Sequence, residues 1–291
     1  MRTDGKKLKN VDPMYQVVPH FMTERHDAMN MITLDIPLEP LQKYIRKKAE
    51  EGIKISHMML ILAAYVRTIS QFPALNRFIV NRKAYAHNDI TVSMVVLKTN
   101  SREDETMSKI YFEPTDTIFD VKEKVGEYID ENRKYETENS TDSIIKSLLK
   151  IPGLLRCATG LLKWMDKHGL LPKAIIKASP FHASFLITNL ASIRTNHIYH
   201  HVYDFGTTSI SMALGNMREV PRRTIDGEIV HDRCIPAGMV MDERIASGSY
   251  FALAFRAFKR YLKNPELLEQ PPESVKTDFD DQKPKKEKKK K

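Results

Sequence analysis

The sequence has little cysteine, no long apolar run and none of the best-known catalytic motifs. Two cysteines, Cys157 and Cys234, in 291 residues are too few for a disulfide scaffold. No segment approaches the roughly 18 consecutive apolar residues of a membrane-spanning helix. The basic N-terminus lacks a signal-like apolar segment, so we expect a cytoplasmic protein with free thiols. A Gly-rich phosphate loop, a GxSxG elbow, a CxxC pair and a dinucleotide fingerprint are also absent.

The formal charge of +9 is concentrated at one end of the chain. Residues 283–291 hold seven lysines and one glutamate, so the remaining 282 residues carry only +3. We expect residues 271–291 to be a disordered, Lys-rich tail. Because the lysine run contains no aromatic side chain for stacking on bases, we expect no nucleic-acid partner.

Hydrophobic periodicity predicts an α+β protein with a large mixed β-sheet and helices packed on it. Residues 1–30 are expected to be irregular, and a single domain is expected over 14–264 with a helical insertion at 143–177. The Asp226-Gly227 pair predicts a two-residue type I′ hairpin turn. Helices are predicted at 38–52, 56–71, 117–134 and 249–263, and strands at 31–36, 76–80, 89–98, 107–112, 184–188, 208–214 and 228–241.

A polar cluster precedes the predicted strand 208–214. His197, His200, His201 and Asp204 lie within eight residues, a spacing that a metal site can use. No other segment supplies a further ligand, so we favour a polar loop and predict no metal.

Three segments resemble a known family. ISHMMLILAAYVRTISQFPALNRFI matches a buried helix followed by an FPxLN turn, and FLITNLASI matches a strand with an SNLG segment. IVHDRCIPAGMVMDERIASGSYFALAFRAFKRYL matches a last strand, an active loop (DHRxxDG in the family) and a last helix. In this order they resemble the catalytic domain of the dihydrolipoyl acyltransferases of 2-oxoacid dehydrogenase complexes. That domain has the chloramphenicol acetyltransferase-like (coenzyme A-dependent acyltransferase) fold.

The resemblance implies acyl transfer from coenzyme A or another thioester, at a site between the subunits of a homotrimer. In the family a loop histidine is the general base, a serine or threonine hydroxyl stabilises the oxyanion, and a loop aspartate pairs with an N-terminal arginine. Here Glu243 stands at the histidine position and Ser247 at the aspartate position, while Asp242, Arg244 and Gly248 are retained. The arginine position falls near Met14-Tyr15.

Several residues are therefore candidates for the chemistry. Glu243 is either the base or a loop residue paired with Arg244 or Arg25, and His200 or His201 is an alternative base. The resemblance implies an oxyanion role for Thr188, with Ser184 as the alternative. It implies a loop-shaping role for Asp242, Arg244, Ser247 and Gly248.

We expect transfer to a small-molecule acceptor, with acyl-coenzyme A as substrate and a non-standard base. The alternative is a catalytically inactive binding or scaffold protein of the same fold. For the 143–177 insertion, we favour a helical lid packed on its own domain or on a neighbouring subunit over contact with a membrane surface.

Overall fold

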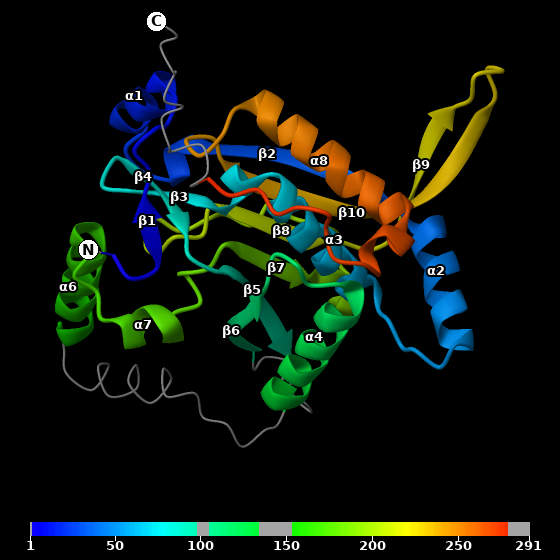
Figure 1. The fold of residues 1–291 in the computed structure, drawn as a ribbon, viewed down its shortest axis with the longest axis horizontal. Coiled ribbons are helices and arrows are strands. Elements are labelled where there is room, and N and C mark those ends of the chain that lie inside the picture. Colours follow the sequence, from blue (N-terminus) through cyan, green and yellow to red (C-terminus); the bar gives the residue numbers. More distant parts are fainter. Residues whose placement is uncertain (1, 98–104, 134–152, 279–291) are drawn as a thin grey trace, which may run out of the picture.

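The computed structural model describes residues 2–97, 105–133 and 153–278, and it confirms the predicted α+β class (Figure 1). A large mixed sheet has the strand order β2-β10-β8-β7-β5-β6, with β9 paired to β10, and a small sheet has the order β1-β4-β3. In the large sheet, β7 runs parallel to both β5 and β8, and the other pairs are antiparallel. The strands are β1 (Gly5–Lys7), β2 (Met29–Pro37), β3 (Arg77–Val80), β4 (Lys83–His87), β5 (Ile90–Leu97), β6 (Glu105–Phe112), β7 (Phe185–Asn189), β8 (Ile210–Leu214), β9 (Arg218–Arg223) and β10 (Ile229–Asp242).

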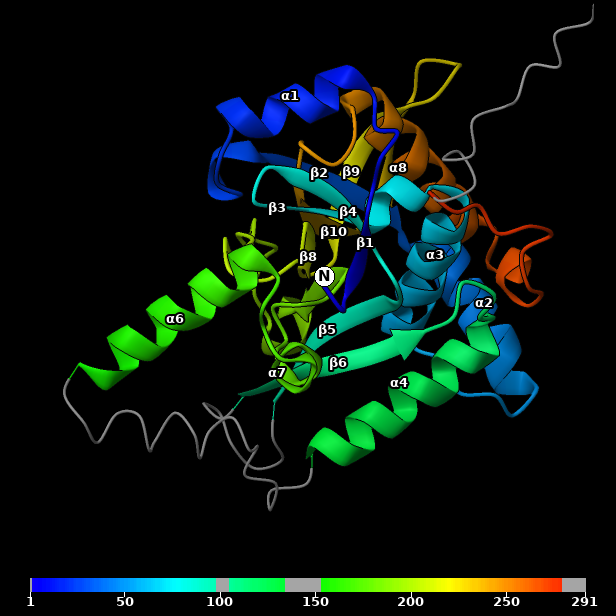
Figure 2. The same cartoon turned by 60° about the vertical axis from the view of Figure 1, so that its left-hand side comes forward.

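The helices lie on both sides of the large sheet. Figure 2 shows α2, α3 and α4 on one side of it and α6 and α7 on the other. The α-helices are α1 (Pro13–Phe21), α2 (Leu38–Glu50), α3 (His57–Gln71), α4 (Ile118–Arg133), α6 (Leu154–His168), α7 (Lys173–Ala178) and α8 (Gly248–Lys263). Short 3-10 turns lie at His26–Ala28, Pro73–Asn76, Leu190–Ile193 and Pro265–Leu268. Within the described ranges, no helix is both long and apolar enough to cross a membrane.

The apolar core lies between the large sheet and the helices α2, α3, α4 and α8. The predicted buried helix is α3, which is apolar on almost every side and begins where the Ser56 hydroxyl accepts a bond from the Met59 amide at 3.2 Å. It ends at Phe72, before Pro73. On the sheet, the core-facing residues include Ile36, Met94, Ile187, Met212 and Met239.

The opposite face of the large sheet is also buried, but it is rich in hydroxyl side chains. Because side chains alternate along a strand, the residues between the core-facing positions point to this second face. The irregular segments 179–184 and 194–208 lie directly on it. Its buried hydroxyl residues are Thr91, Ser93, Ser184, Thr188, Ser209 and Ser211.

Two expectations about the ends of the chain are wrong. Residues 1–30 are not irregular throughout, because they include β1 and α1, and Asp12 caps α1 by accepting from the Met14 amide at 2.9 Å. Residues 271–278 are ordered against the domain, where Asp278 binds Arg77 at 2.6 Å and the Lys276 amide donates to the Ser70 carbonyl. The rest of the predicted tail, 279–291, and residues 143–152 of the predicted insertion lie outside the described residues.

The predicted type I′ turn is also wrong, although the hairpin exists. Only Gly227 has a positive φ there, at +88°, and five residues separate the paired Arg223 and Ile229. A two-residue turn with both φ angles positive occurs instead at Asn81 and Arg82, between β3 and β4. The sequence analysis missed β4 because this dipeptide lacks glycine.

Candidate active site

The loop after β10 is built around a fully buried carboxylate, that of Asp242. Arg244 binds it with two nitrogens at 2.8 Å each, and Arg25 approaches it at 3.5 Å. Arg244 also donates to the carbonyls of Met22 and Thr23 at 3.1 Å. Burial lowers the pKa of Arg25, whereas the charge of Asp242 acts in the opposite direction. The contacts of Arg25 and Arg244 with Asp242, together with those of Arg244 with Met22 and Thr23, hold this loop against the N-terminal segment.

Glu243 takes no part in this ion-pair network. It is half-buried, its amide donates to the Ala28 carbonyl at 2.9 Å, and its carboxylate accepts from Asn30 Nδ2 at 2.6 Å. The pairing of Glu243 with Arg244 or Arg25 is therefore wrong, because Asp242 occupies both arginines. Arg25, expected only as a partner of Glu243, contacts Asp242 instead, and only the folded chain reveals this contact.

Ser247 and Gly248 begin α8. The Ser247 hydroxyl accepts from the Tyr250 amide at 3.1 Å and so caps the helix. Gly248 lies outside the left-handed region, and a Cβ added there would meet no atom within 4 Å. The conformation of the loop therefore does not require glycine at position 248.

The two candidate oxyanion donors differ in how their hydroxyls are bonded. The Ser184 hydroxyl accepts from the Thr91 amide at 3.0 Å and donates to the Asp89 carbonyl at 3.2 Å, so both its roles are filled within the sheet. The Thr188 hydroxyl is buried, and no described residue is its hydrogen-bond partner. A buried polar group without a partner calls for a functional or structural explanation. The Thr188 hydroxyl can therefore donate a hydrogen bond to a substrate, whereas the Ser184 hydroxyl is already engaged within the protein.

The four polar residues of segment 197–204 diverge. His197 Nε2 lies 3.1 Å from the Thr33 hydroxyl, and Asp204 binds the ring of His26 at 2.7 Å. In the described part of the chain, no group of three or more His, Cys, Asp or Glu side chains gathers as a metal site. His201 is exposed, and its ring contacts that of Tyr203.

His200 lines a cavity of about 310 Å³ on the hydroxyl-rich face. Its Nδ1 lies 3.0 Å from the His201 carbonyl, and because a carbonyl only accepts, Nδ1 donates and Nε2 keeps a lone pair. Its own carbonyl accepts from the Ser211 hydroxyl, which fixes the segment to β8. The other lining residues are largely apolar: Val95, Met107, Pro180, Phe181, Leu186, Val202, Tyr203 and Thr208.

The strand register shows which candidates lie close together. Leu186, which lines the His200 cavity, lies two residues before Thr188 on the same face of β7, about 7 Å away along the strand. Thr188 is level with Gly238, whereas Glu243 lies beyond the end of β10, a separation of about 16 Å along the strands. Along the strands, His200 is two residues from the level of Thr188, because its carbonyl accepts from Ser211, which is paired with Leu186, whereas Glu243 is five residues from that level.

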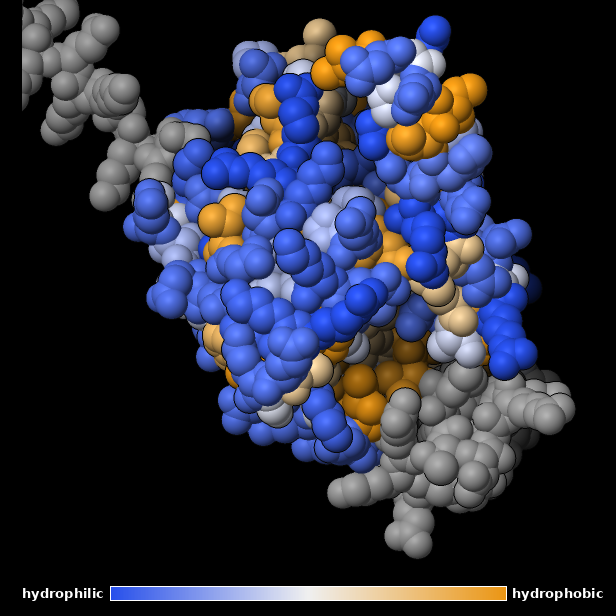
Figure 3. All heavy atoms as spheres, turned by 90° about the vertical axis from the view of Figure 1, so that its right-hand side faces the viewer, coloured by the Kyte–Doolittle hydropathy of each residue, from blue (hydrophilic) through white to orange (hydrophobic). Residues whose placement is uncertain are grey.

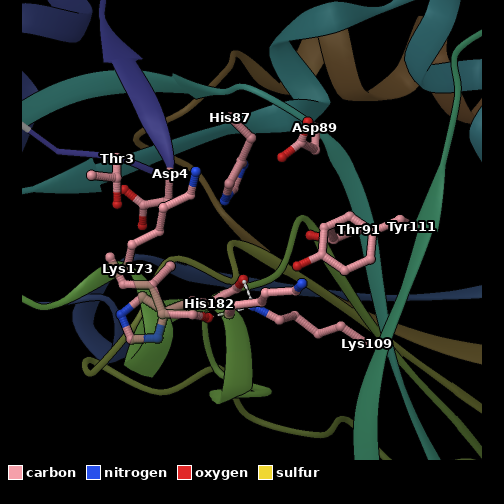
Figure 4. A pocket seen from close by; sticks show the side chains of 11 residues that line it. Thr3, Asp4, His87, Asp89, Thr91, Lys109, Tyr111, Lys173 and His182 are labelled. Atoms are coloured by element: carbon pink, nitrogen blue, oxygen red, sulfur yellow. Dashed lines mark hydrogen bonds between the residues drawn. The ribbon is translucent and has the colours of Figure 1, made fainter.

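A second cavity, of about 340 Å³, contains titratable residues that the sequence analysis did not single out (Figure 4). Burial lowers the pKa of His87 to about 4, and its two nitrogens are bonded to the Asn76 carbonyl and the Thr207 hydroxyl. Burial also lowers the pKa of Lys109 to about 8, and its amine donates to the carbonyls of Ile176 and His182. These bonds give both side chains a structural role in joining the segments around the cavity.

Comparisons with known proteins identify the fold. Residues 180–269 match the family model of the 2-oxoacid dehydrogenases acyltransferase (catalytic domain). A probable dihydrolipoamide acetyltransferase from Listeria monocytogenes 4b F2365 is similar in structure, with a TM-score of 0.56 and 14% identity over 89% of this chain and 94% of that one. A chloramphenicol acetyltransferase gives a TM-score of 0.54 with 11% identity over 89% of this chain and 99% of that one. The chain has the chloramphenicol acetyltransferase-like fold.

The acyltransferase-like architecture predicted from the three segments is thus confirmed. A dihydrolipoamide acetyltransferase from Azotobacter vinelandii is also similar, with a TM-score of 0.50 and 11% identity over 89% of this chain and 93% of that one. No curated protein sequence matches this chain. The family model covers strand β7 with Thr188, the segment with His200 and the loop with Asp242, which are the parts of the candidate site.

Proposed function

We propose that this protein is an acyltransferase that takes an acyl group from acyl-coenzyme A and transfers it to a small hydroxyl, amine or thiol acceptor. The observation that carries the proposal is the bonding of His200. Its Nδ1–H is directed to a carbonyl, so the neutral ring keeps its Nε2 lone pair for a proton at a largely apolar cavity. The apolar lining suits the acyl chain of a thioester.

In this mechanism His200 takes the proton of the acceptor while the acceptor oxygen, nitrogen or sulfur attacks the thioester carbonyl. The Thr188 hydroxyl, which has no internal partner, donates to the oxyanion that forms. When the tetrahedral intermediate collapses, the carbon–sulfur bond breaks, and the thiolate of coenzyme A takes up the proton from His200. Asp242 and the two arginines keep the neighbouring loop in place.

The experiment follows free thiol released from acetyl-, butyryl- and hexanoyl-coenzyme A in the presence of small alcohols, amines and dihydrolipoamide. We expect His200→Gln to lower turnover by about 10²–10⁴-fold, and Thr188→Val by about 10²–10³-fold. His231→Gln on the exposed part of β10 is the matched control and should leave turnover unchanged. Unchanged turnover in His200→Gln would remove this residue from the mechanism.

A homotrimer is part of the proposal, as the resemblance implies. Light scattering of the purified chain would give about three times the mass of 33.6 kDa. A monomer at micromolar concentration would contradict it.

A non-catalytic binding protein is the second candidate function. The observation that favours it is Glu243, which replaces the family's loop histidine and is bonded to Asn30. Calorimetry with coenzyme A separates the candidates. Saturable binding without turnover on any acceptor would favour the binding protein, and absence of both would contradict each of them.

A further inference from the structure

Asp166 anchors helix α6 to the domain. Its carboxylate binds Arg2 at 2.8 Å, accepts from the Gly206 amide at 3.1 Å and lies 3.2 Å from His182 Nε2. Although burial alone would raise it, the pKa of Asp166 falls to about 2 because of His182 and the positive charge of Arg2. The helix extends from this anchor away from the body of the molecule (Figure 2).

The side of α6 away from this anchor is apolar and exposed. Leu161 is 57% exposed and Trp164 is 51% exposed. With 3.6 residues per turn, both lie about 140–160° around the helix from Asp166. Leu170, in the turn before α7, is 55% exposed, and Ile175 on α7 is 38% exposed. This apolar stripe is therefore not packed on its own domain, and the expectation of a lid packed on a neighbouring subunit stays a prediction.

The exposed charges around the stripe have one sign. Asp166 is the single acidic residue in 153–178, and it is buried in the anchor just described. Five cationic side chains of the segment are exposed: Arg156, Lys163, Lys167, Lys173 and Lys177. By contrast, the side of the molecule with α2 and the β9–β10 hairpin is mostly hydrophilic, with only separate apolar patches (Figure 3).

We propose that α6 and α7 bind the surface of an anionic phospholipid bilayer. A helix with Leu and Trp on one side and lysines beside them suits the interface, where apolar side chains enter the acyl region and cations remain among the headgroups. Each lysine near an anionic surface contributes about 1 kcal/mol. The five exposed cations favour an anionic bilayer as the partner, since a second copy of the chain or a neutral apolar surface would not need them. The proposal is independent of the acyl-transfer reaction.

Trp164 is the only tryptophan of the chain, so its fluorescence reports on this surface alone. The full-length protein is titrated with vesicles of phosphatidylcholine, with and without 30% phosphatidylglycerol, at low and high salt. We expect a blue shift and protection from iodide quenching only with the anionic vesicles, and weaker binding at high salt. No shift and no co-sedimentation with anionic vesicles at low salt would overturn the proposal.

Matched variants distinguish vesicle binding through the α6 surface from non-specific electrostatic attraction of any cationic side chains. Lys163→Glu with Lys167→Glu should weaken vesicle binding at least tenfold, and Leu161→Ser should weaken it about tenfold. The control is Lys43→Glu with Lys47→Glu, an exposed pair with the same spacing on α2, which should bind like the unmodified chain.

Two other outcomes contradict the proposal. One is binding that survives these α6 substitutions but is lost when residues 283–291 are removed, because the lysine-rich end then accounts for it. The other is a blue shift of Trp164 that appears on concentrating the protein without vesicles, because a second copy then covers the stripe.

Discussion

The two faces of the large sheet are both buried, but different side chains fill them. On one face Ile187 and Met212 pack with Phe258 and Tyr65 of the helices. On the other face, serines and threonines lie beneath irregular segments whose carbonyls and amides they bind, as Ser93 does with the Pro180 carbonyl at 2.6 Å. Dense apolar packing stabilises the first face without needing directional bonds. The second face holds irregular backbone in place, and the candidate site lies there.

The largest expected effect on stability tests the apolar face. Phe258 is almost fully buried and contacts the Tyr65 ring edge-on. Phe258→Ala removes this packing and leaves a cavity, so we expect a loss of about 3–5 kcal/mol in the free energy of unfolding. Chemical denaturation measures it, and a loss below about 1 kcal/mol would show that the helices can close the space.

A similar loss is expected at the end of β10. Asp242→Asn leaves the buried cations of Arg25 and Arg244 without their shared carboxylate, and we expect about 3–5 kcal/mol of destabilisation. The matched Glu243→Gln should change stability by less than about 1 kcal/mol, because this side chain is half-buried and bound to Asn30. Equal losses in the two variants would contradict the assignment of the buried ion pairs.

Acid should weaken the fold through His87. Its folded pKa is about 4, below the ordinary 6.5, so between these values the unfolded chain binds the proton and the folded chain does not. Stability should therefore fall by about 3 kcal/mol as pH drops from 6.5 to 4, and this contribution should be constant below 4. Denaturation at a series of pH values checks the slope, and His87→Gln should flatten it. An unchanged slope in that variant would assign the effect to other groups.

The smallest effects distinguish two hydroxyls of the same face. Ser184→Ala removes a hydroxyl that both accepts and donates, so we expect a loss of about 1–2 kcal/mol. Thr188→Val removes a hydroxyl without a partner and keeps the shape of the side chain, so stability should stay within about 0.5 kcal/mol. Thermal unfolding compares them directly. A large loss in Thr188→Val would show that this hydroxyl has a structural partner after all.

The parts of the fold that sequence predicted well have strong local patterns. The apolar run of α3 and the Ser56 cap lie within one short stretch, and so do the β-branched residues of β5. The site was harder, because its contacts join distant segments. Arg25 meets Asp242 across more than 200 residues, and His87 meets Thr207 across 120. Periodicity carries no information on such pairs.

The same limit applies within the candidate site. Sequence identified both His200 and Thr188, but it gave His200 only as an alternative to Glu243, without separating it from His201, and it kept Ser184 as an alternative to Thr188. What separates them is hydrogen bonding, namely a carbonyl beside His200 Nδ1 and no partner for the Thr188 hydroxyl.

The bond between Arg2 and Asp166 also bears on how the chain folds as it is made. These residues are 164 positions apart, and at 5–20 residues per second the second emerges roughly 8–30 s after the first. During that time Arg2 can pair with Asp4 and lie over the Phe78 ring, and the small sheet can form from β1, β3 and β4 without its anchor to α6. Arg2 thus completes its contacts only after another 164 residues have been synthesised.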